Sequence, residues 1–355
     1  MIFHCINFCV AKLQNIFIYY IYYNLDFALE LSVEEIFLNH LLFSKKIINK
    51  YEFKKINFEL FVKIGSSNYL LPLIYYKLKK KKILHLVPDD LQNYLKEIYT
   101  INKQRNAVLI EEIETLTNFF KTKKLFFVLL KGSHNIMSNL YLDNGERMVG
   151  DIDFLVRKSD LKKVKILLNL EGYFNKFNYK IWKTKHPPRF VNSKKIFALE
   201  PHTELLIYRK RKHLRVREFI KKLQFEERNN YLIKYMVLNY QINDYGHLYG
   251  KYNLRNIYDV YVFMINKKIE IKNFKNKYFR RFFLITNVLG VTNLKIEINF
   301  FDKLYMARFK LKKSNFLYYL IDKFICDIVR YLPIRFMQLV EFTINKDYRN
   351  KAFSK

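Results

Sequence analysis

The sequence predicts an α+β fold, in which a mixed β-sheet core is flanked by N-terminal and C-terminal helical regions. Short continuous apolar runs, typical of buried strands, gather in the middle of the chain. Before and after them, apolar residues recur at spacings of three and four, as in amphipathic helices. Apolar residues make up 50% of the 355 positions, so the chain can bury a substantial core.

The N-terminal third reads as mostly helical from about residue 31 to residue 120. Leu109, Ile113, Leu116 and Phe120 are spaced by four, three and four, which places them on one helix face. Such a stripe is typical of a face that packs on the core.

The first ~30 residues contain an apolar, aromatic segment at 15–23. Lys12 and the polar residues after it keep this run below the ~20 residues that a membrane span requires. It also lacks the charged start and small-residue cleavage site of a secretory signal. We therefore expect a packed first helix or an extension, and no membrane span.

The middle of the chain alternates strand and helix patterns. The apolar run 125–130 predicts a strand that ends in a turn at Lys131-Gly132-Ser133, and 151–156 predicts a second strand. A third strand is expected at 196–206. Its residues Glu200, His202 and Glu204 alternate and would share one face, while Pro201 predicts an edge or an irregularity there.

Three regions follow from these changes of pattern. We expect an N-terminal helical region at residues 1–100, a core that contains the strands at 101–215 and a C-terminal helical region at 216–355.

Asp151 and Asp153 predict a cation site. Two residues apart on a strand, their carboxylates lie on the same face and repel each other unless a cation neutralises them. Magnesium is bound in this way, through one or two protein carboxylates together with substrate phosphates. The pair therefore indicates phosphate chemistry.

The preceding turn suits phosphate binding. Gly132 followed by Ser133 lets backbone N–H groups approach a phosphate at the start of a helix. Lys131 would add a compact positive charge beside it.

The segment from Val128 to Tyr173 resembles the uncharacterised bacterial nucleotidyltransferase family of the polymerase-beta-like superfamily. That family has Leu-Lys-Gly after a strand, an arginine and a glycine before an Asp-x-Asp strand, and a helix ending in Gly-Tyr. The corresponding residues here are Leu130-Lys131-Gly132, Arg147, Gly150-Asp151-Ile152-Asp153 and Gly172-Tyr173. Glu200-Pro201-His202 matches a later acidic residue and histidine, with proline in place of an aliphatic residue.

The resemblance implies that residues 101–215 are a catalytic core with a nucleotidyltransferase fold, which uses two Mg²⁺ ions and an NTP. The enzyme would transfer a nucleoside monophosphate to an acceptor hydroxyl and release pyrophosphate. Asp151, Asp153 and Glu200 would be the catalytic metal ligands, with Glu204 as a competing third carboxylate. Lys131, Gly132, Ser133 and Arg147 would bind the nucleotide, and His202 would support a carboxylate.

The formal charge of +32 indicates a phosphate-rich partner, although an AT-rich coding bias also enriches Lys and Asn. The sequence leaves the acceptor open among a small molecule, a protein and an RNA, and basic runs such as 209–217 are candidates for RNA contact. The alternative function is a non-catalytic nucleic-acid-binding protein on a degenerate nucleotidyltransferase scaffold. Three cysteines are too few for a disulfide framework, which favours a reducing, cytoplasmic location.

Overall fold

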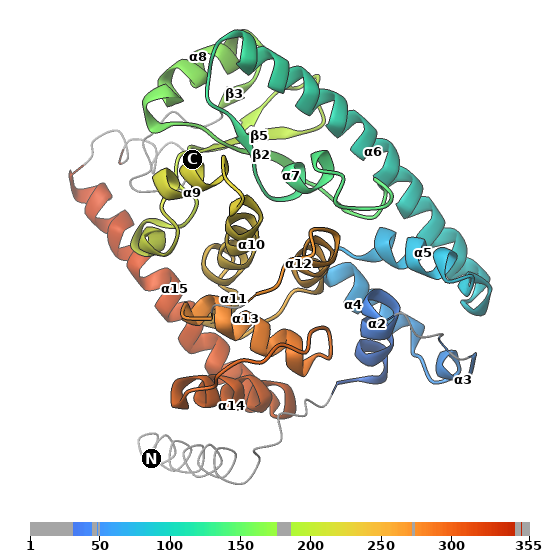
Figure 1. Ribbon diagram of the computed structural model, residues 1–355. Coiled ribbons are helices and arrows are strands. Elements are labelled where there is room, and N and C mark those ends of the chain that lie inside the picture. The colour runs from blue at the N-terminus through green and yellow to red at the C-terminus, as the bar shows by residue number, and fades with distance from the viewer. Residues whose placement is uncertain are drawn as a thin grey trace. The chain divides into compact units, whose positions relative to one another are not determined.

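The computed structural model describes residues 31–44, 48, 50–175, 186–271, 274–344 and 349 (Figure 1). These residues form two compact units. The larger unit contains residues 31–244 and 253–272, and the smaller unit contains 245–252 and the described residues from 274 onward. The apolar segment 15–23 lies outside the described residues.

The larger unit begins with helices, of which the first starts at a capping box. The Ser32 hydroxyl accepts a hydrogen bond from the Glu35 N–H, and the Glu35 carboxylate accepts one from the Ser32 N–H. The helical elements up to the sheet are α2 (Val33–Phe43), α3 (Lys50–Phe53), α4 (Phe58–Ser67), α5 (Leu71–Lys80), η1 (Leu84–Leu86) and α6 (Asp89–Thr122).

Helix α6 joins these helices to the sheet through the predicted apolar stripe. Leu109, Ile113 and Leu116 are buried along it, as is Phe120 near its end, which confirms that stripe. The Phe120 ring lies 5.5 Å from the ring of Phe154 in the sheet. Because α6 runs without a break from Asp89 to Thr122, it crosses the expected boundary at residue 100, and the three-region division stays a prediction.

Within the described residues, five short strands form one mixed sheet in the order β1-β2-β5-β4-β3. β1 pairs with β2, β4 with β5 and β3 with β4, all antiparallel, whereas β2 and β5 are parallel. The strands and the helices between them are β1 (Val128–Leu129), α7 (Lys131–Met137), β2 (Asp151–Leu155), η2 (Lys158–Asp160), α8 (Leu161–Leu170), β3 (Phe174–Asn175), β4 (Phe190–Val191) and β5 (Ala198–His202).

Strand β5 is shorter than the sequence predicts, since it ends at His202 and leaves Glu204 beyond the strand. The side chain of Asn243 explains this end. It donates to the Leu205 carbonyl at 2.9 Å and accepts from the Ile207 N–H at 3.0 Å, which removes this backbone from the ladder.

Pro201 is tolerated because the pairing of β5 is incomplete on one side. Strand β4 pairs with β5 only between Phe190 and Leu199, so Pro201 lies past that ladder while β2 pairs along the other side. The expected irregularity is therefore present, although β5 lies inside the sheet order rather than at its edge.

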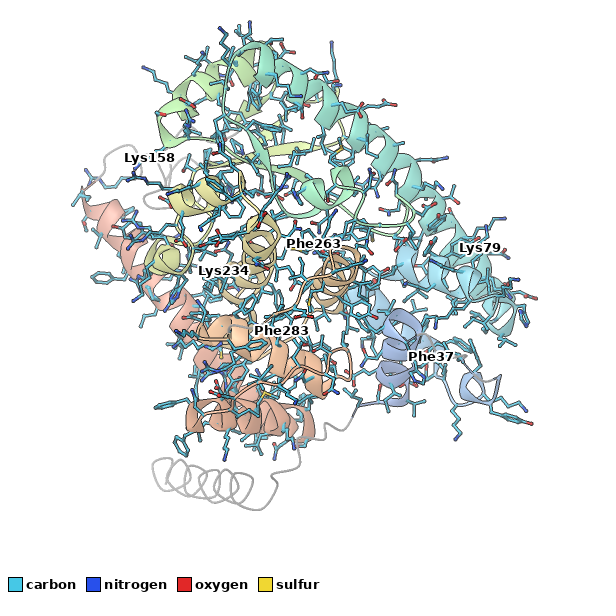
Figure 2. The ribbon with its side chains drawn as sticks, in the orientation of Figure 1. Phe37, Lys79, Lys158, Lys234, Phe263 and Phe283 are labelled. Atoms are coloured by element: carbon cyan, nitrogen blue, oxygen red, sulfur yellow. The ribbon has the colours of Figure 1, made fainter. Side chains whose placement is uncertain are left out.

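Helices complete the larger unit after the sheet. They are η3 (Tyr208–His213), α9 (Val216–Lys222), α10 (Arg228–Leu238), the π-helical turn η4 (Asn239–Asn243) and α12 (Leu254–Asn266). Phe37 and Phe263 belong to the core of this unit, and each is at most 3% exposed (Figure 2). The α+β class with helical flanks is thus confirmed.

The described part of the smaller unit contains helices α11 (Gly246–Tyr249), α13 (Lys277–Val288), α14 (Phe300–Ser314) and α15 (Phe316–Ile344). Phe283 lies in its core (Figure 2). Asp302 at the start of α14 has no exposed surface and binds two arginines of α13, Arg280 at 2.6 Å and Arg281 at 2.9 Å.

Helix α15 packs on its own unit through polar groups. Asp322 binds Arg308 at 2.5 Å and Lys312 at 2.7 Å, and Asp327 accepts a hydrogen bond from the Tyr249 hydroxyl at 2.6 Å. The large apolar side chains that it exposes are Phe316, Leu317, Leu320, Phe324, Ile325, Ile328, Val329, Tyr331, Leu332, Ile334, Phe336, Leu339 and Ile344.

Within the part of the chain that the structure describes, none of the helices combines the length and the apolar character needed to cross a membrane.

Candidate active site

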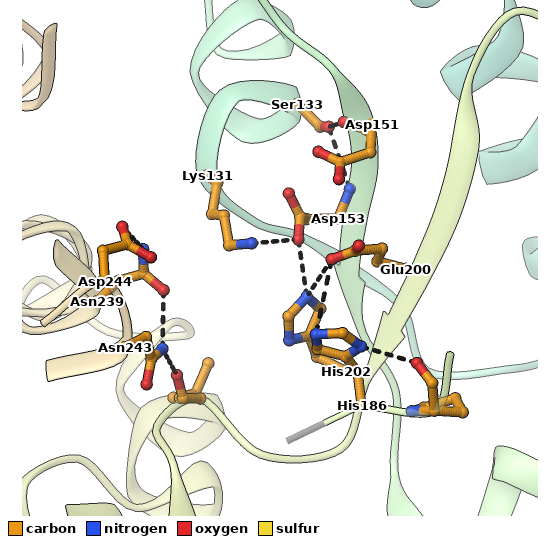
Figure 3. A network of polar contacts seen from close by, with 12 residues as sticks. Lys131, Ser133, Asp151, Asp153, His186, Glu200, His202, Asn239, Asn243 and Asp244 are labelled. Carbon is orange, nitrogen blue, oxygen red and sulfur yellow. Dashed lines mark hydrogen bonds and ion pairs between the residues drawn. The ribbon is translucent and has the colours of Figure 1, made fainter. Parts of the chain in front are cut away.

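Two parallel strands bring three carboxylates together. Asp151 and Asp153 share one face of β2 because side chains alternate along a strand. The register pairs Asp153 with Glu200 on β5, so Glu200 joins the aspartates across the ladder. One oxygen from each of the three lies within 4.8 Å of the others (Figure 3).

Lys131 supplies a positive charge to this cluster. It begins α7 directly after β1, and its Nζ lies 2.5 Å from Asp153 Oδ1 (Figure 3). Its backbone has a φ of +49°, a left-handed conformation that is unfavourable for a lysine. Burial alone would lower the pKa of the Lys131 ammonium, but the charge of Asp153 outweighs this and raises it.

His202 is the second partner of Asp153. Its Nε2 lies 2.7 Å from the same oxygen, Oδ1, and the side chain is 1% exposed. Burial disfavours the imidazolium and lowers the pKa of His202 to about 4. Burial of Asp153 works against its charge, but the hydrogen bond with His202 and the charge of Lys131 hold its pKa below the ordinary value. Asp153 is therefore a carboxylate.

The pKa of Asp151 is shifted in the opposite direction, upward. Burial and the neighbouring charges of Asp153 and Glu200 raise the pKa of Asp151 to about 7. Three carboxylates facing one ammonium leave an excess of negative charge, which a divalent cation would neutralise. Hard oxygen ligands of this kind suit Mg²⁺, so the side chains fit the ion that the sequence implies.

Gly132 and Ser133 have structural contacts at the base of the cluster. The Ser133 side chain is buried, and its hydroxyl donates to the Asp151 carbonyl at 3.2 Å and accepts from the Asp153 N–H at 3.3 Å. A Cβ on Gly132 would lie 3.0 Å from a methyl carbon of Val149, so glycine permits this close packing. Phosphate binding by the two residues stays a prediction.

Arg147 is bound to a later helix of the same unit. Its guanidinium pairs with Asp259 of α12 at 3.0 Å, and the Tyr141 hydroxyl donates to the same carboxylate at 2.7 Å. This ion pair anchors the loop before β2. Contact of Arg147 with a nucleotide stays a prediction.

Glu204 lies beyond the end of β5, where its carboxylate is 3.7 Å from Arg211 of η3. It is not in the group formed by Asp151, Asp153 and Glu200. Of the two glutamates that compete in the sequence, Glu200 is the one that lies beside the aspartates.

Sequence reasoning assigned no role to His186, which the structure places beside Glu200. Its Nε2 lies 3.7 Å from Glu200 Oε2, and its ring centroid is 4.6 Å from that of His202. Asp259 was also missed as the partner of Arg147. The sequence His186-Pro187-Pro188 indicates a rigid loop, because it contains two prolines, but it does not indicate contact with Glu200.

Comparison with known proteins agrees with this arrangement. Residues 54–277 match the family model described as uncharacterised nucleotidyltransferase. The match spans more than half of the 355 residues and includes all three clustered carboxylates, Lys131 and His202. Neither the curated proteins nor the solved structures gave a significant match. The chain therefore belongs to the uncharacterised nucleotidyltransferase family.

Proposed function

We propose that this protein is a magnesium-dependent nucleotidyltransferase that moves a nucleoside monophosphate from an NTP to an acceptor hydroxyl. The observation that carries the proposal is the group of Asp151, Asp153 and Glu200 next to Lys131, inside the segment that matches the family. The cysteine-poor composition favours the cytoplasm as its location.

Each residue near the cluster has a role in this proposal. Asp151, Asp153 and Glu200 hold two Mg²⁺ ions, and His202 orients Asp153 through its hydrogen bond. Lys131 places a positive charge where the triphosphate and the leaving pyrophosphate would lie. Since the Ser133 hydroxyl is already bound to β2, Gly132 and Ser133 would act on a phosphate through backbone N–H groups.

The reaction is a substitution at phosphorus. The acceptor oxygen forms a bond to the α-phosphorus, the bond to the β-phosphate oxygen breaks, and the proton of the hydroxyl passes to solvent. Bound Mg²⁺ would supply neutralisation of the phosphate charge and lower the pKa of the acceptor hydroxyl. The protein contributes alignment and a fixed arrangement of charge, which dominate transfers of this kind.

The test is a transfer assay with the full chain. Purified protein is incubated with Mg²⁺, each α-labelled NTP, and cell fractions that separately contain RNA, proteins and small metabolites. Label that becomes attached to one fraction identifies the acceptor class.

We expect Asp153→Asn and Glu200→Gln each to lower the transfer rate by at least ~100-fold, because each loses a charge that the transition state needs. Glu204→Gln is the matched control. It changes the same kind of side chain just past β5 and outside the cluster, and we expect it to keep activity within ~3-fold. Loss of activity in Glu204→Gln with retention in Glu200→Gln would reverse the assignment of the third carboxylate.

One feature favours the second candidate, a nucleic-acid-binding protein without catalysis. The turn η3 exposes basic side chains next to an aromatic ring, with the Arg211 guanidinium 4.4 Å from the centroid of the Tyr208 ring. Such pairs contact RNA phosphates and bases. If no NTP is consumed with any fraction while RNA binding is unaffected by Asp153→Asn, this second candidate replaces the first.

A further inference from the structure

We propose that His186, Glu200 and His202 form a separate site for a divalent transition metal such as Zn²⁺. The group contains two imidazole nitrogens and one carboxylate. The neighbouring group of Asp151, Asp153 and Glu200 contains carboxylates alone. Glu200 belongs to both groups, and its Oε2 is the oxygen that faces the histidines (Figure 3).

The spacing of the donor atoms suits a single ion. Glu200 Oε2 lies 3.7 Å from His186 Nε2 and 3.8 Å from His202 Nε2, and one ligand atom from each residue lies within 4.8 Å of the others. Ligands at the ~2.0–2.1 Å typical of zinc are separated from one another by slightly less than these distances. Small side-chain movements would therefore close the group around an ion.

His186 is held in the tautomer that a metal ligand needs. Its Nδ1 lies 2.7 Å from the Pro187 carbonyl oxygen, which can only accept a hydrogen bond, so Nδ1 carries the proton. In this tautomer the lone pair is on Nε2, the nitrogen that lies 3.7 Å from Glu200 Oε2. A backbone carbonyl that fixes the second ring nitrogen is the usual support of a metal-bound histidine.

His202 can change its tautomer to join the site. In the metal-free protein its Nε2–H donates to Asp153, and among the residues that the structure describes its buried Nδ1 has no hydrogen-bond partner. Metal binding moves the imidazole proton from Nε2 to Nδ1, so the ring stays neutral and no proton is gained or lost. Asp153 Oδ1, 2.7 Å from Nε2, is then close enough to contribute a fourth donor.

The donor set determines which metals are accepted. Magnesium prefers six oxygen ligands and keeps several waters, whereas imidazole nitrogens favour Zn²⁺ and its neighbours in the first transition row. Two cation sites of different preference would thus share the Glu200 carboxylate, and also that of Asp153 when it supplies the fourth donor. Metal binding at the histidines can be measured without any NTP, so this inference does not depend on the proposed transferase activity.

The experiment uses the full chain, stripped of metal with a chelator and then desalted into buffer with excess Mg²⁺. Co²⁺ is titrated as a coloured substitute for Zn²⁺, and Zn²⁺ affinity is measured by competition. The variants are His186→Ala, the control His85→Ala at an exposed histidine of η1, and Asp151→Asn, which alters only the carboxylate group. Circular dichroism checks that each variant is folded.

We expect the wild-type protein to bind one Co²⁺ with the visible absorption of nitrogen coordination, despite the excess of Mg²⁺. His186→Ala should weaken Co²⁺ and Zn²⁺ binding by at least ~10-fold, while His85→Ala and Asp151→Asn keep both. Wild-type protein without such absorption, or unchanged affinity in folded His186→Ala, would overturn the site. Loss of binding in Asp151→Asn alone would assign the ion to the carboxylates.

Discussion

Asp153 links every charged group of the site, since Lys131 and His202 contact the same oxygen and Asp151 and Glu200 lie beside it. Lys131 and His202 stabilise its negative charge, while Asp151 and Glu200 oppose it. The metal-free protein therefore contains unrelieved repulsion, which burial at Asp151 increases.

This repulsion predicts that Asp151→Asn stabilises the metal-free protein. The pKa of Asp151 is raised to about 7 from an ordinary value of 3.8, so the folded protein loses stability relative to the unfolded chain as pH rises between these values. Asparagine cannot ionise. We expect a melting temperature about 2–4 °C higher than wild type at pH 8, measured by calorimetry in the presence of a chelator.

The pH dependence provides the control for this prediction. At pH 4.5 Asp151 is largely protonated in the folded protein, so the gain should nearly vanish there. An equal gain at both pH values would mean that the amide packs better and that repulsion is not the cause.

The part of the site that a single strand determines was predictable from the sequence. Alternation along a strand placed Asp151 and Asp153 together. The position of Glu200 depended on the register between β2 and β5, which only the family resemblance implied. The contacts of His186 with Glu200 and of Arg147 with Asp259 join separate segments, 112 residues apart in the second case, and no local pattern reveals them.

At the level of secondary-structure elements, the spacing of apolar residues predicted the long helices well but the strands only in part. The predicted stripe on α6 is buried, yet the apolar run 125–130 forms a ladder only at Val128–Leu129. The end of α6 uses the start of that run, because Lys124 is left-handed and the Leu125 N–H donates to the Phe120 carbonyl at 3.0 Å. The first residue of the apolar run therefore belongs to the C-terminal end of the helix and not to a strand.

The buried carboxylate of Asp302 joins α14 to two arginines of α13. We expect Asp302→Asn to lower the free energy of unfolding by about 3–5 kcal/mol, because Arg280 and Arg281 would lose their shared counter-charge. Urea denaturation monitored by circular dichroism measures this loss. Glu226→Gln, at an exposed position, is the control and should change stability by less than ~0.5 kcal/mol.

The loss of unfolding free energy in Asp302→Asn should disappear at acidic pH. Burial opposes the charge of Asp302, but its hydrogen bonds with Arg280 and Arg281 keep its pKa below the ordinary 3.8. The stabilisation is complete above that ordinary value and decreases as pH falls through the lowered pKa. A difference from wild type that stayed constant below pH 3 would contradict the ion-pair explanation.

Over the whole molecule, the net charge of +32 predicts salt-sensitive binding of RNA. Replacing Arg209, Arg211 and Lys212 of η3 by glutamine should reduce the slope of log affinity against log salt by about 2, at roughly 0.7 for each lost phosphate contact on a single strand. Fluorescence anisotropy with labelled RNA over a range of KCl concentrations gives this slope.

Lys79, Lys80 and Lys82 provide a matched substitution at another basic run of the same unit. An equal change of slope in both triple variants would show that only total charge matters. An unchanged slope in the η3 variant would remove that turn from the RNA contact.

The net charge of +32 also affects whether molecules of this protein associate with one another, because α15 exposes a row of large apolar side chains. At low ionic strength, like charges keep separate molecules apart before their α15 surfaces meet. At 1 M salt the Debye length falls to about 3 Å, and this protection is lost while hydrophobic attraction persists. Conditions that release a bound polyanion are therefore also the conditions that favour clustering of the free protein, so the order of salt and dilution steps governs how much of it stays dispersed.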